Sequence, residues 1–197
     1  GKTVVSTIDS NIQKLAEQRL AAFEKEYGSK GSSILVMNPN NGEVYAMASS
    51  TSFNLEDPRN EKNLLTKYKK SEIDKMSEKE KVEAFNEIWK NPIVSNTFEP
   101  GSTFKPFTVA AGLEEGILKG DETFICNGYE QIGSNRIHCS HRSGHGRITL
   151  SESISLSCND AIMQIAAKEG KDVFTKYQRE FNFGSLTGID LPGEAKT

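Results

Sequence analysis

The sequence predicts an α+β fold in which helices pack on an antiparallel sheet. Apolar residues recur at spacings of three and four over residues 12–27, which is typical of a helix with one buried stripe. Two strand-like runs, 33–38 and 43–48, flank an Asn-Gly pair, which is a strong hairpin signal. Helical patterns return after Ser102 and within 150–168. The chain therefore combines helices with locally paired strands.

The first helix is expected to begin at a capping box formed by Ser10 and Gln13 and to end near Gly28. Its buried stripe predicts a packing role. The hairpin that follows predicts the first two strands of the sheet.

Residues 55–91 form a segment in which acidic residues and lysines are nearly balanced. Ser77 and Glu80 predict a capping box, and the helix after it carries a narrow apolar stripe. That stripe consists of Val82, Phe85 and Trp89. We expect a surface helical excursion that docks through Trp89, and a partner-binding lid is the alternative.

Composition limits the functions that the chain can have. At 197 residues with 36% apolar residues, it can build one core of ordinary size. A net charge of -3 gives no reason to expect nucleic acid or an anionic membrane surface as a partner. No apolar run is long enough to cross a bilayer.

The tetrapeptide Ser102-Thr103-Phe104-Lys105 is the first candidate site. If a helix begins at Ser102, residues three apart lie one above the other, so the hydroxyl and the amine share one face. Burial would lower the pKa of the Lys105 amine and let it take the hydroxyl proton. The ordinary alternative is a capped helix start with a solvated lysine, because Ser-x-x-Lys alone is common.

A second polar pair, Ser157 and Asn159, lies between two helical patterns, the first of which opens with a capping box of Thr149 and Glu152. On a tight turn, both polar side chains can point the same way. The hydroxyl could then relay a proton to a leaving group while the amide holds a substrate amide. The intervening Cys158 is interpreted as a small buried filler.

All three histidines and two of the three cysteines fall between residues 126 and 145. Cys126, Cys139 and His141, with His145, Asp121 or water as a fourth ligand, would give the sulfur and nitrogen donors that tetrahedral zinc prefers. The spacing matches no standard zinc-finger pattern. A disulfide between Cys126 and Cys139 and a pair of unpaired buried thiols are the open alternatives.

Further matches extend these motifs. A Glu-Pro-Gly at residues 99–101 precedes Ser102, and a Leu-Pro-Gly-Glu occupies 191–194. With these matches, which run in order from residue 7 to residue 194, the chain resembles the class B penicillin-binding proteins, the serine DD-transpeptidases of peptidoglycan synthesis. The resemblance implies a penicillin-binding protein transpeptidase or serine β-lactamase-like fold across 1–197. That domain would be incomplete at its C-terminus and would carry a charged helical insertion at about 55–91.

The resemblance also implies roles for the candidate residues. Ser102 would attack the penultimate D-alanine of a stem peptide ending in D-Ala-D-Ala, with Lys105 as its base. Ser157 would relay a proton to the leaving group, and Asn159 would bond the peptide amide or Lys105. An amine of a neighbouring stem peptide would resolve the acyl-enzyme, and β-lactams would acylate the same serine. This acyl transfer would need no cofactor.

The cysteines fit the same resemblance. Cys126, Cys139 and His141 look like the extra feature of a zinc-containing subset found among clostridial and gut bacteria, in which Zn would be structural. His145 belongs to a Gly-His-Gly that the family shows with or without those cysteines.

The resemblance further implies a place at the extracytoplasmic face of the bacterial membrane, held by an N-terminal anchor outside this chain, and a cell-wall glycosyltransferase as partner. The parent enzyme would serve elongation, division or sporulation. The family's Lys-Thr/Ser-Gly motif is absent, since Lys196-Thr197 is followed by no glycine. We therefore expect residues 1–197 alone to show little or no crosslinking activity.

Two other functions are compatible with the sequence. A related β-lactamase or penicillin-sensing domain shares Ser-x-x-Lys. Asn159 differs from the apolar residue usual in the class D-like group, and no Glu-x-x-Leu-Asn of the class A type follows Ser157. A non-catalytic scaffold module would use its helices only for packing.

Overall fold

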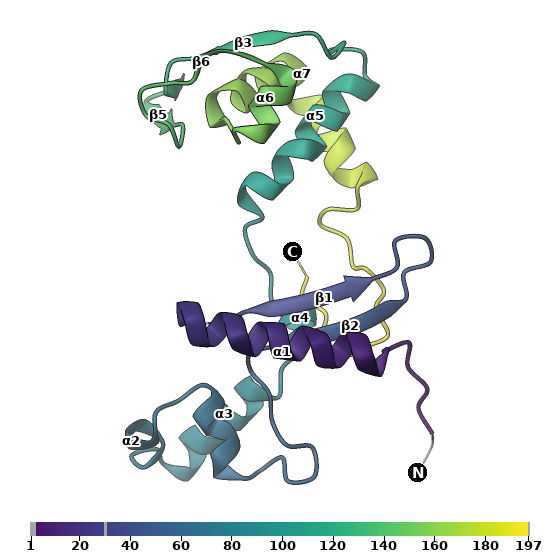
Figure 1. Cartoon of the computed structure of the whole chain (residues 1–197), viewed down its shortest axis with the longest axis vertical. Helices are drawn as coiled ribbons and strands as arrows, with labels where there is room; N and C mark the ends of the chain where they lie inside the picture. Colours follow the sequence, from purple (N-terminus) through teal and green to yellow (C-terminus); the bar gives the residue numbers. More distant parts are fainter. Residues whose placement is uncertain (1–2, 30, 197) are drawn as a thin grey trace. The chain divides into compact units, whose positions relative to one another are not determined.

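The computed structural model describes residues 3–29 and 31–196, and Figure 1 shows the course of the chain. The chain divides into two compact units. One comprises the chain up to Asn96 together with Asp190–Ala195, and the other comprises Thr97–Ile189 and the chain end after Ala195. Both units combine helices with antiparallel strands, which confirms the predicted α+β class.

The first unit contains the predicted helix and hairpin, followed by short helices. Its elements are α1 (Ser10–Tyr27), β1 (Ser33–Met37), β2 (Val44–Ser49), the 3-10 helix η1 (Glu61–Thr66), α2 (Lys70–Ile73), α3 (Glu78–Ile88) and α4 (Pro92–Ser95). Strands β1 and β2 pair antiparallel, and Gly42 takes a φ of 78° in the turn that joins them. Ala16 and Leu20 of α1 pack on Ala46 and Ala48 of β2, and these four side chains form a small core.

The start of α1 differs from the prediction. Asp9 caps the helix, since its Oδ1 accepts the N–H groups of Asn11 at 2.8 Å and Ile12 at 3.0 Å, so the expected capping box of Ser10 and Gln13 is wrong. The Gln13 amide instead bonds both main-chain groups of Met47, at 2.7 Å and 3.1 Å. These are outward-facing groups of β2, so the side chain covers part of a strand edge that would otherwise expose unpaired donors and acceptors.

The charged segment folds around its own apolar cluster. Buried side chains of η1, α2 and α3 meet there: Leu64, Ile73, Ala84, Phe85 and Ile88. The Trp89 ring stacks on Phe85 at a centroid distance of 5.6 Å and its Nε1 donates to the Pro58 carbonyl at 3.2 Å. The predicted stripe was wrong at Val82, whose side chain is 57% exposed, because Ala84 and Ile88 face the cluster instead.

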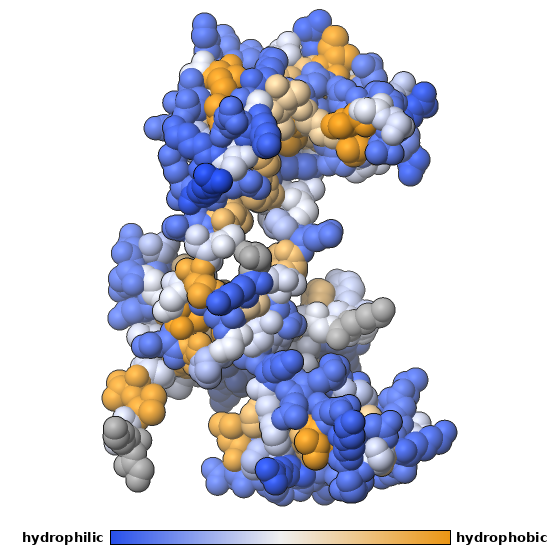
Figure 2. All heavy atoms as spheres, turned by 180° about the vertical axis from the view of Figure 1, so that it is seen from behind, coloured by the Kyte–Doolittle hydropathy of each residue, from blue (hydrophilic) through white to orange (hydrophobic). Residues whose placement is uncertain are grey.

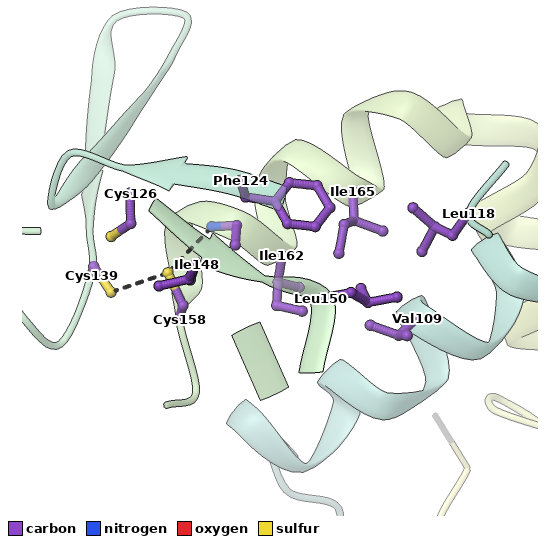
Figure 3. Packing of buried hydrophobic residues seen from close by; sticks show 11 residues of the cluster. Val109, Leu118, Phe124, Cys126, Cys139, Ile148, Leu150, Cys158, Ile162 and Ile165 are labelled. Carbon is purple, nitrogen blue, oxygen red and sulfur yellow. Dashed lines mark hydrogen bonds between the residues drawn. The ribbon is translucent and has the colours of Figure 1, made fainter. Parts of the chain in front are cut away.

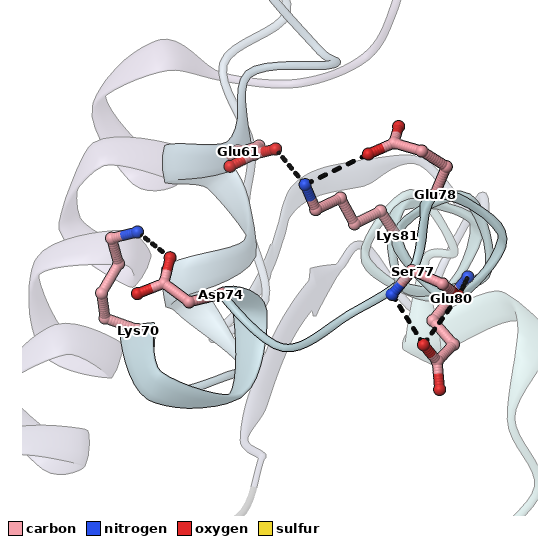
Figure 4. Close-up of polar contacts among 7 residues, drawn as sticks. All are labelled: Glu61, Lys70, Asp74, Ser77, Glu78, Glu80 and Lys81. Atoms are coloured by element: carbon pink, nitrogen blue, oxygen red, sulfur yellow. Dashed lines mark hydrogen bonds and ion pairs between the residues drawn. The ribbon is translucent and has the colours of Figure 1, made fainter.

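Polar contacts organise the outer face of the same segment (Figure 4). The capping box of Ser77 and Glu80 forms as predicted at the start of α3. Lys81 bridges Glu61 at 2.7 Å and Glu78 at 3.3 Å, which ties α3 to η1. Such exposed pairs each add at most about 1 kcal/mol, so the apolar cluster supplies most of the stability here.

The second unit contains the two sequence motifs. Its elements are η2 (Gly101–Phe104), α5 (Lys105–Glu114), β3 (Thr123–Cys126), β4 (Tyr129–Ile132), β5 (Asn135–His138), β6 (Gly146–Thr149), α6 (Leu150–Ser155) and α7 (Asn159–Glu180). Strand β3 pairs with β6 and β4 pairs with β5, in both cases antiparallel. The core between the helices and strands consists of Val109, Leu118, Phe124, Ile148, Leu150, Ala161, Ile162 and Ile165, together with three cysteines (Figure 3).

Helix α7 is longer than the expected pattern and is interrupted at Gly170, whose φ is 74°. Just before the break lies Glu169, a 6% exposed residue with no hydrogen-bond partner for either carboxyl oxygen within the described residues. It faces α5 at Gly112, where an added Cβ would come within 2.9 Å of Glu169 Oε1 and 2.8 Å of Leu118 Cδ1. Any larger residue at position 112 would require the Leu118 and Glu169 side chains to move.

Hydrophilic side chains dominate the face of the molecule shown in Figure 2, and apolar side chains form separate patches on it. Among the described residues, no helix combines the length and apolar character needed to cross a membrane.

The buried Glu169 carboxyl predicts a pH-dependent stability. Burial raises its pKa to about 7, against a smaller opposing effect of the Gly112 N–H. The unfolded chain therefore ionises first, and stability falls as pH rises from about 4.5 to 7. In urea unfolding, the unsubstituted chain should lose about 3 kcal/mol between pH 4.5 and 8 that Glu169→Gln does not lose. Glu114→Gln, at an exposed site of α5, should keep the loss, and an equal loss in Glu169→Gln would contradict the prediction.

Candidate active site

Ser102 lies in η2, directly before α5. The sequence predicted an α-helix from Ser102, whereas the structure has a 3-10 turn from Gly101 and begins the α-helix at Lys105, with Pro106 in its first turn. The Lys105 N–H donates to the Ser102 carbonyl, and residues three apart eclipse each other in a 3-10 helix. Ser102 and Lys105 therefore lie one above the other, and the Ser102 side chain is exposed.

Aromatic packing holds this turn in place. The Phe104 ring lies 4.8 Å from Phe183 and 5.8 Å from Phe174, and Phe107 meets the Phe183 ring edge-on at 5.0 Å. These contacts fix η2 and the start of α5 against α7 and the chain after it. Sequence reasoning missed this cluster, although the repeated phenylalanines beside Lys105 were a signal for it.

The Lys105 amine is the centre of the site. Its Nζ donates to the Ser157 carbonyl at 2.6 Å, to Ser157 Oγ at 2.9 Å and to Asn159 Oδ1 at 2.6 Å. Three acceptors match the three N–H groups of an ammonium. Burial lowers the pKa of Lys105, while the nearby thiols of Cys139 and Cys158 act in the opposite direction with smaller effect.

Ser157 and Asn159 reach Lys105 from the turn between α6 and α7. Thr149 and Glu152 form the predicted capping box of α6. After that helix the chain turns at Ser157, which takes a φ of 50°. A non-glycine residue in this left-handed region costs about 1–2 kcal/mol. The strained turn presents both the carbonyl and the hydroxyl of Ser157 to the amine.

Asn159 is held from both sides. Its Oδ1 accepts from Lys105, and its Nδ2 donates to the His138 carbonyl at the end of β5, at 3.0 Å. The structure thus brings Lys105, Ser157 and Asn159 into direct contact. Within the described part of the chain, no hydrogen bond joins the Ser102 hydroxyl to Lys105; in unliganded enzymes such bonds are often long and tighten when substrate binds.

A sulfur-rich cluster lies on the other side of the same turn. Cys126, Cys139, His145 and Cys158 each offer a ligand atom, and these atoms lie within 4.8 Å of one another. Figure 3 shows the three sulfur atoms pointing toward one another. Cys139 Sγ lies 3.9 Å from Cys158 Sγ and 3.7 Å from His145 Nδ1. The four side chains are therefore close enough to hold a metal ion.

This set differs by one member from the sequence-based candidates. His141 lies outside the cluster, and its Nδ1 is within hydrogen-bonding distance of the Gly144 carbonyl, at 3.0 Å. Cys158, interpreted from the sequence as a filler, takes part instead because the N-terminus of α7 folds back onto the end of β5. Its place inside the Ser-x-Asn motif was the only sequence signal.

All three cysteines are free thiols in the structure. Although burial alone would raise the pKa of Cys139, the backbone N–H groups of His141, Asn159 and Asp160 outweigh it and lower that pKa to about 6. Burial and the neighbouring thiols raise the pKa of Cys158 to about 12. A second thiolate beside the first is therefore disfavoured, and a bound cation would stabilise it.

The chain is similar to cell-wall proteins. Residues 32–197 match the penicillin binding protein transpeptidase domain. Stage V sporulation protein D of Bacillus subtilis is 35% identical over 190 residues, which cover 95% of this chain and 26% of that protein. Peptidoglycan D,D-transpeptidase MrdA of Escherichia coli is 28% identical over 98% of this chain and 28% of its own length. The chain thus spans about a quarter of these curated relatives.

Solved structures of penicillin-binding proteins also resemble this chain. Penicillin binding protein 3 of Mycobacterium tuberculosis, complexed with aztreonam, superimposes with a TM-score of 0.77 at 27% identity, over 100% of this chain and 39% of that one. Its apo form gives the same values. Since the family match covers most of the sequence and the fold superimposes over its whole length, the chain belongs to the penicillin-binding protein transpeptidase family.

Proposed function

We propose that this chain carries the nucleophile and base of a peptidoglycan D,D-transpeptidase that works through an acyl-enzyme on Ser102. The observation that carries the proposal is the contact of Lys105 with both Ser157 and Asn159. Two residues more than fifty positions further along the chain meet the one amine that shares a face with Ser102. A solvated lysine at an ordinary helix start would make no such contacts.

Acylation follows from this arrangement. In its neutral form, which burial favours, the Lys105 amine takes the Ser102 proton as the oxygen attacks the carbonyl of the penultimate D-alanine. When the peptide C–N bond breaks, the Ser157 hydroxyl gives its proton to the departing D-alanine amine and regains one from Lys105 Nζ, 2.9 Å away. Asn159 holds the lysine in line. No metal or cofactor takes part in these steps.

Transfer of the acyl group to the second stem peptide runs through the acylation steps in reverse order. The amine of a neighbouring stem peptide attacks the ester carbon, an amide bond forms, and the released oxygen of Ser102 recovers its proton. A β-lactam acylates Ser102 in the same way, but its leaving group stays tethered. The names of the relatives and the aztreonam complex of a structural neighbour support both ligand classes, stem peptides and β-lactams.

The substrate implies the surroundings of the enzyme. Crosslinking acts on peptidoglycan, which lies outside the cytoplasm, so we propose that the activity lies at the extracytoplasmic face of the cell membrane. Crosslinking joins newly polymerised strands, which makes a cell-wall glycosyltransferase the expected partner.

We infer that Cys126, Cys139, His145 and Cys158 bind a structural zinc ion. A tetrahedral ion with Zn–S bonds of about 2.3 Å holds its sulfur atoms about 3.8 Å apart. The spacing of 3.9 Å between Cys139 and Cys158 and of 3.7 Å between Cys139 and His145 fits this geometry. Zinc would supply the positive charge that adjacent thiolates need and would fix the turn that carries Ser157 and Asn159.

Covalent labelling tests the nucleophile. In the complete protein, with any sequence that flanks residues 1–197, a fluorescent penicillin should label the unsubstituted chain and not Ser102→Ala. Ser134→Ala, at an exposed serine of the β4–β5 turn, should label normally. The adduct should persist for hours, since a transpeptidase deacylates slowly in water. Rapid release of hydrolysed penicillin would indicate a β-lactamase instead.

The pH dependence of acylation tests the base. Burial lowers the pKa of Lys105. The apparent pKa of the acid limb of the pH–rate profile should therefore lie below the ordinary lysine value of about 10.4. Lys105→Arg keeps a permanent positive charge and should acylate about 100- to 10,000-fold more slowly at every pH. Lys119→Arg, at an exposed lysine, serves as the matched control. An unchanged profile in Lys105→Arg would remove Lys105 from the mechanism.

Metal analysis tests the zinc ligands. The purified protein should contain about one zinc per chain, and Cys126→Ser and Cys158→Ser should each lose it because three ligands bind zinc much more weakly than four. His141→Ala should retain the metal, since His141 lies outside the cluster. Loss of zinc in His141→Ala but not in Cys158→Ser would restore the sequence-based ligand set, and a Cys126–Cys139 disulfide in the native protein would refute the site.

A further inference from the structure

The residue after Asn159 carries a buried carboxyl group that the proposed mechanism does not use. Asp160 is fully buried in the first turn of α7. Its Oδ2 accepts the Asn127 N–H at 2.7 Å, and its Oδ1 accepts from Gln164 Nε2 at 2.6 Å. Gln164 Nε2 also donates to the Ile125 carbonyl at 2.9 Å. Asp160 therefore joins the start of α7 to the chain at the end of β3.

Asp160 and Asn159 hold the two ends of one hairpin. Asn127 lies just before β4, and His138 is the last residue of β5. Asp160 binds the hairpin where it starts, at the Asn127 N–H, and Asn159 binds it where it ends, at the His138 carbonyl. Two adjacent side chains of α7 thus fix the base of the β4–β5 hairpin.

Packing alone does not explain a carboxylate in this place. A buried ion is costly to desolvate, and apolar residues of similar volume often give equal or greater stability. Here the charge is met by two hydrogen bonds and by the N-terminus of α7. Burial and the Asp160 carboxylate raise the pKa of the neighbouring Glu130. Because hydrogen bonds depend on direction, the bonds of Asp160 fix the position of the first turn of α7.

The Asn159 amide needs such a fixed position. It bridges Lys105 at 2.6 Å and the His138 carbonyl at 3.0 Å, with its oxygen toward one and its nitrogen toward the other. Both bonds form together only if α7 stands at one distance from β5. A displacement of about 1 Å in such an arrangement can slow a reaction about 100-fold.

We propose that Asp160 is a positioning residue for acyl transfer, which acts through Asn159 by tying the first turn of α7 to the base of the β4–β5 hairpin. This inference rests on the function proposed above. In this role Asp160 does not touch the reacting atoms. It aligns the Asn159 amide between Lys105 and His138.

A double-substitution cycle tests the proposal in the complete protein. Asp160→Asn keeps the shape but turns an N–H₂ toward the Asn127 N–H or toward Gln164, which are both donors. The maximal rate of acylation by penicillin should fall about 10- to 100-fold, with a smaller change in penicillin affinity. Asp172→Asn makes the same charge change at an exposed position of α7 and should have no effect.

In an Asn159→Ala background, Asp160→Asn should lower the rate less than about twofold, because the residue through which it acts is gone. Equal fold-losses in both backgrounds would show a general structural role and overturn the proposal. If Asp160→Asn does not fold, Gln164→Leu removes one of the two bonds and should give a smaller loss with the same dependence on Asn159.

A spectroscopic readout separates this inference from the proposed function. With ¹⁵N-labelled asparagine, the Asn159 side-chain amide signals are identified by their absence in Asn159→Ala. They should shift and exchange faster with water in Asp160→Asn and stay unchanged in Asp172→Asn. Unchanged Asn159 signals in Asp160→Asn would refute the positioning role. Failure of the unsubstituted protein to react with penicillin would instead refute the proposed function and leave this comparison valid.

Discussion

The three hydrogen bonds of the Lys105 amine are the constraint on which the site depends. A half-buried ammonium must find three acceptors, and here two residues of one turn provide all of them. The left-handed conformation of Ser157 follows from this demand, since it aims a carbonyl and a hydroxyl at one atom. Burial favours the neutral amine and lowers the pKa of Lys105, whereas the three acceptors favour the ammonium.

Four consecutive residues, 157–160, then connect this amine to the rest of the unit. Cys158 has an extended backbone, in which neighbouring side chains point in opposite directions. The side chains on either side of it contact Lys105, while its own sulfur faces Cys139. Asp160 continues the series toward Asn127. The turn therefore contacts α5 on one side and both ends of the β4–β5 hairpin on the other.

Local patterns predicted the elements well wherever neighbours in the sequence also decide the structure. The capping boxes at Ser77 and Thr149 involve residues three positions apart, and the hairpin of β1 and β2 joins neighbouring strands through one short turn; all of them form. The prediction at Gln13 was wrong because Met47, 34 residues away, offers that side chain two main-chain partners. Val82 was misassigned because a helical stripe gives a face but not the position of the cluster that the face meets.

In the candidate site, too, local patterns were predictable from the sequence and long-range contacts were not. Motif spacing identified the polar residues but not their anchoring, because Asp160 and Cys158 reveal their contacts only when α7 folds back onto the β4–β5 hairpin. Residue type was also a poor guide to Cys158, because a small thiol inside a polar motif was interpreted from the sequence as a buried filler. In the folded unit, the Cys158 sulfur lies 3.9 Å from the Cys139 sulfur, and the Asp160 carboxyl group accepts the Asn127 N–H at 2.7 Å. Both contacts join residues that are far apart in the sequence, so no local pattern within residues 157–160 could predict them.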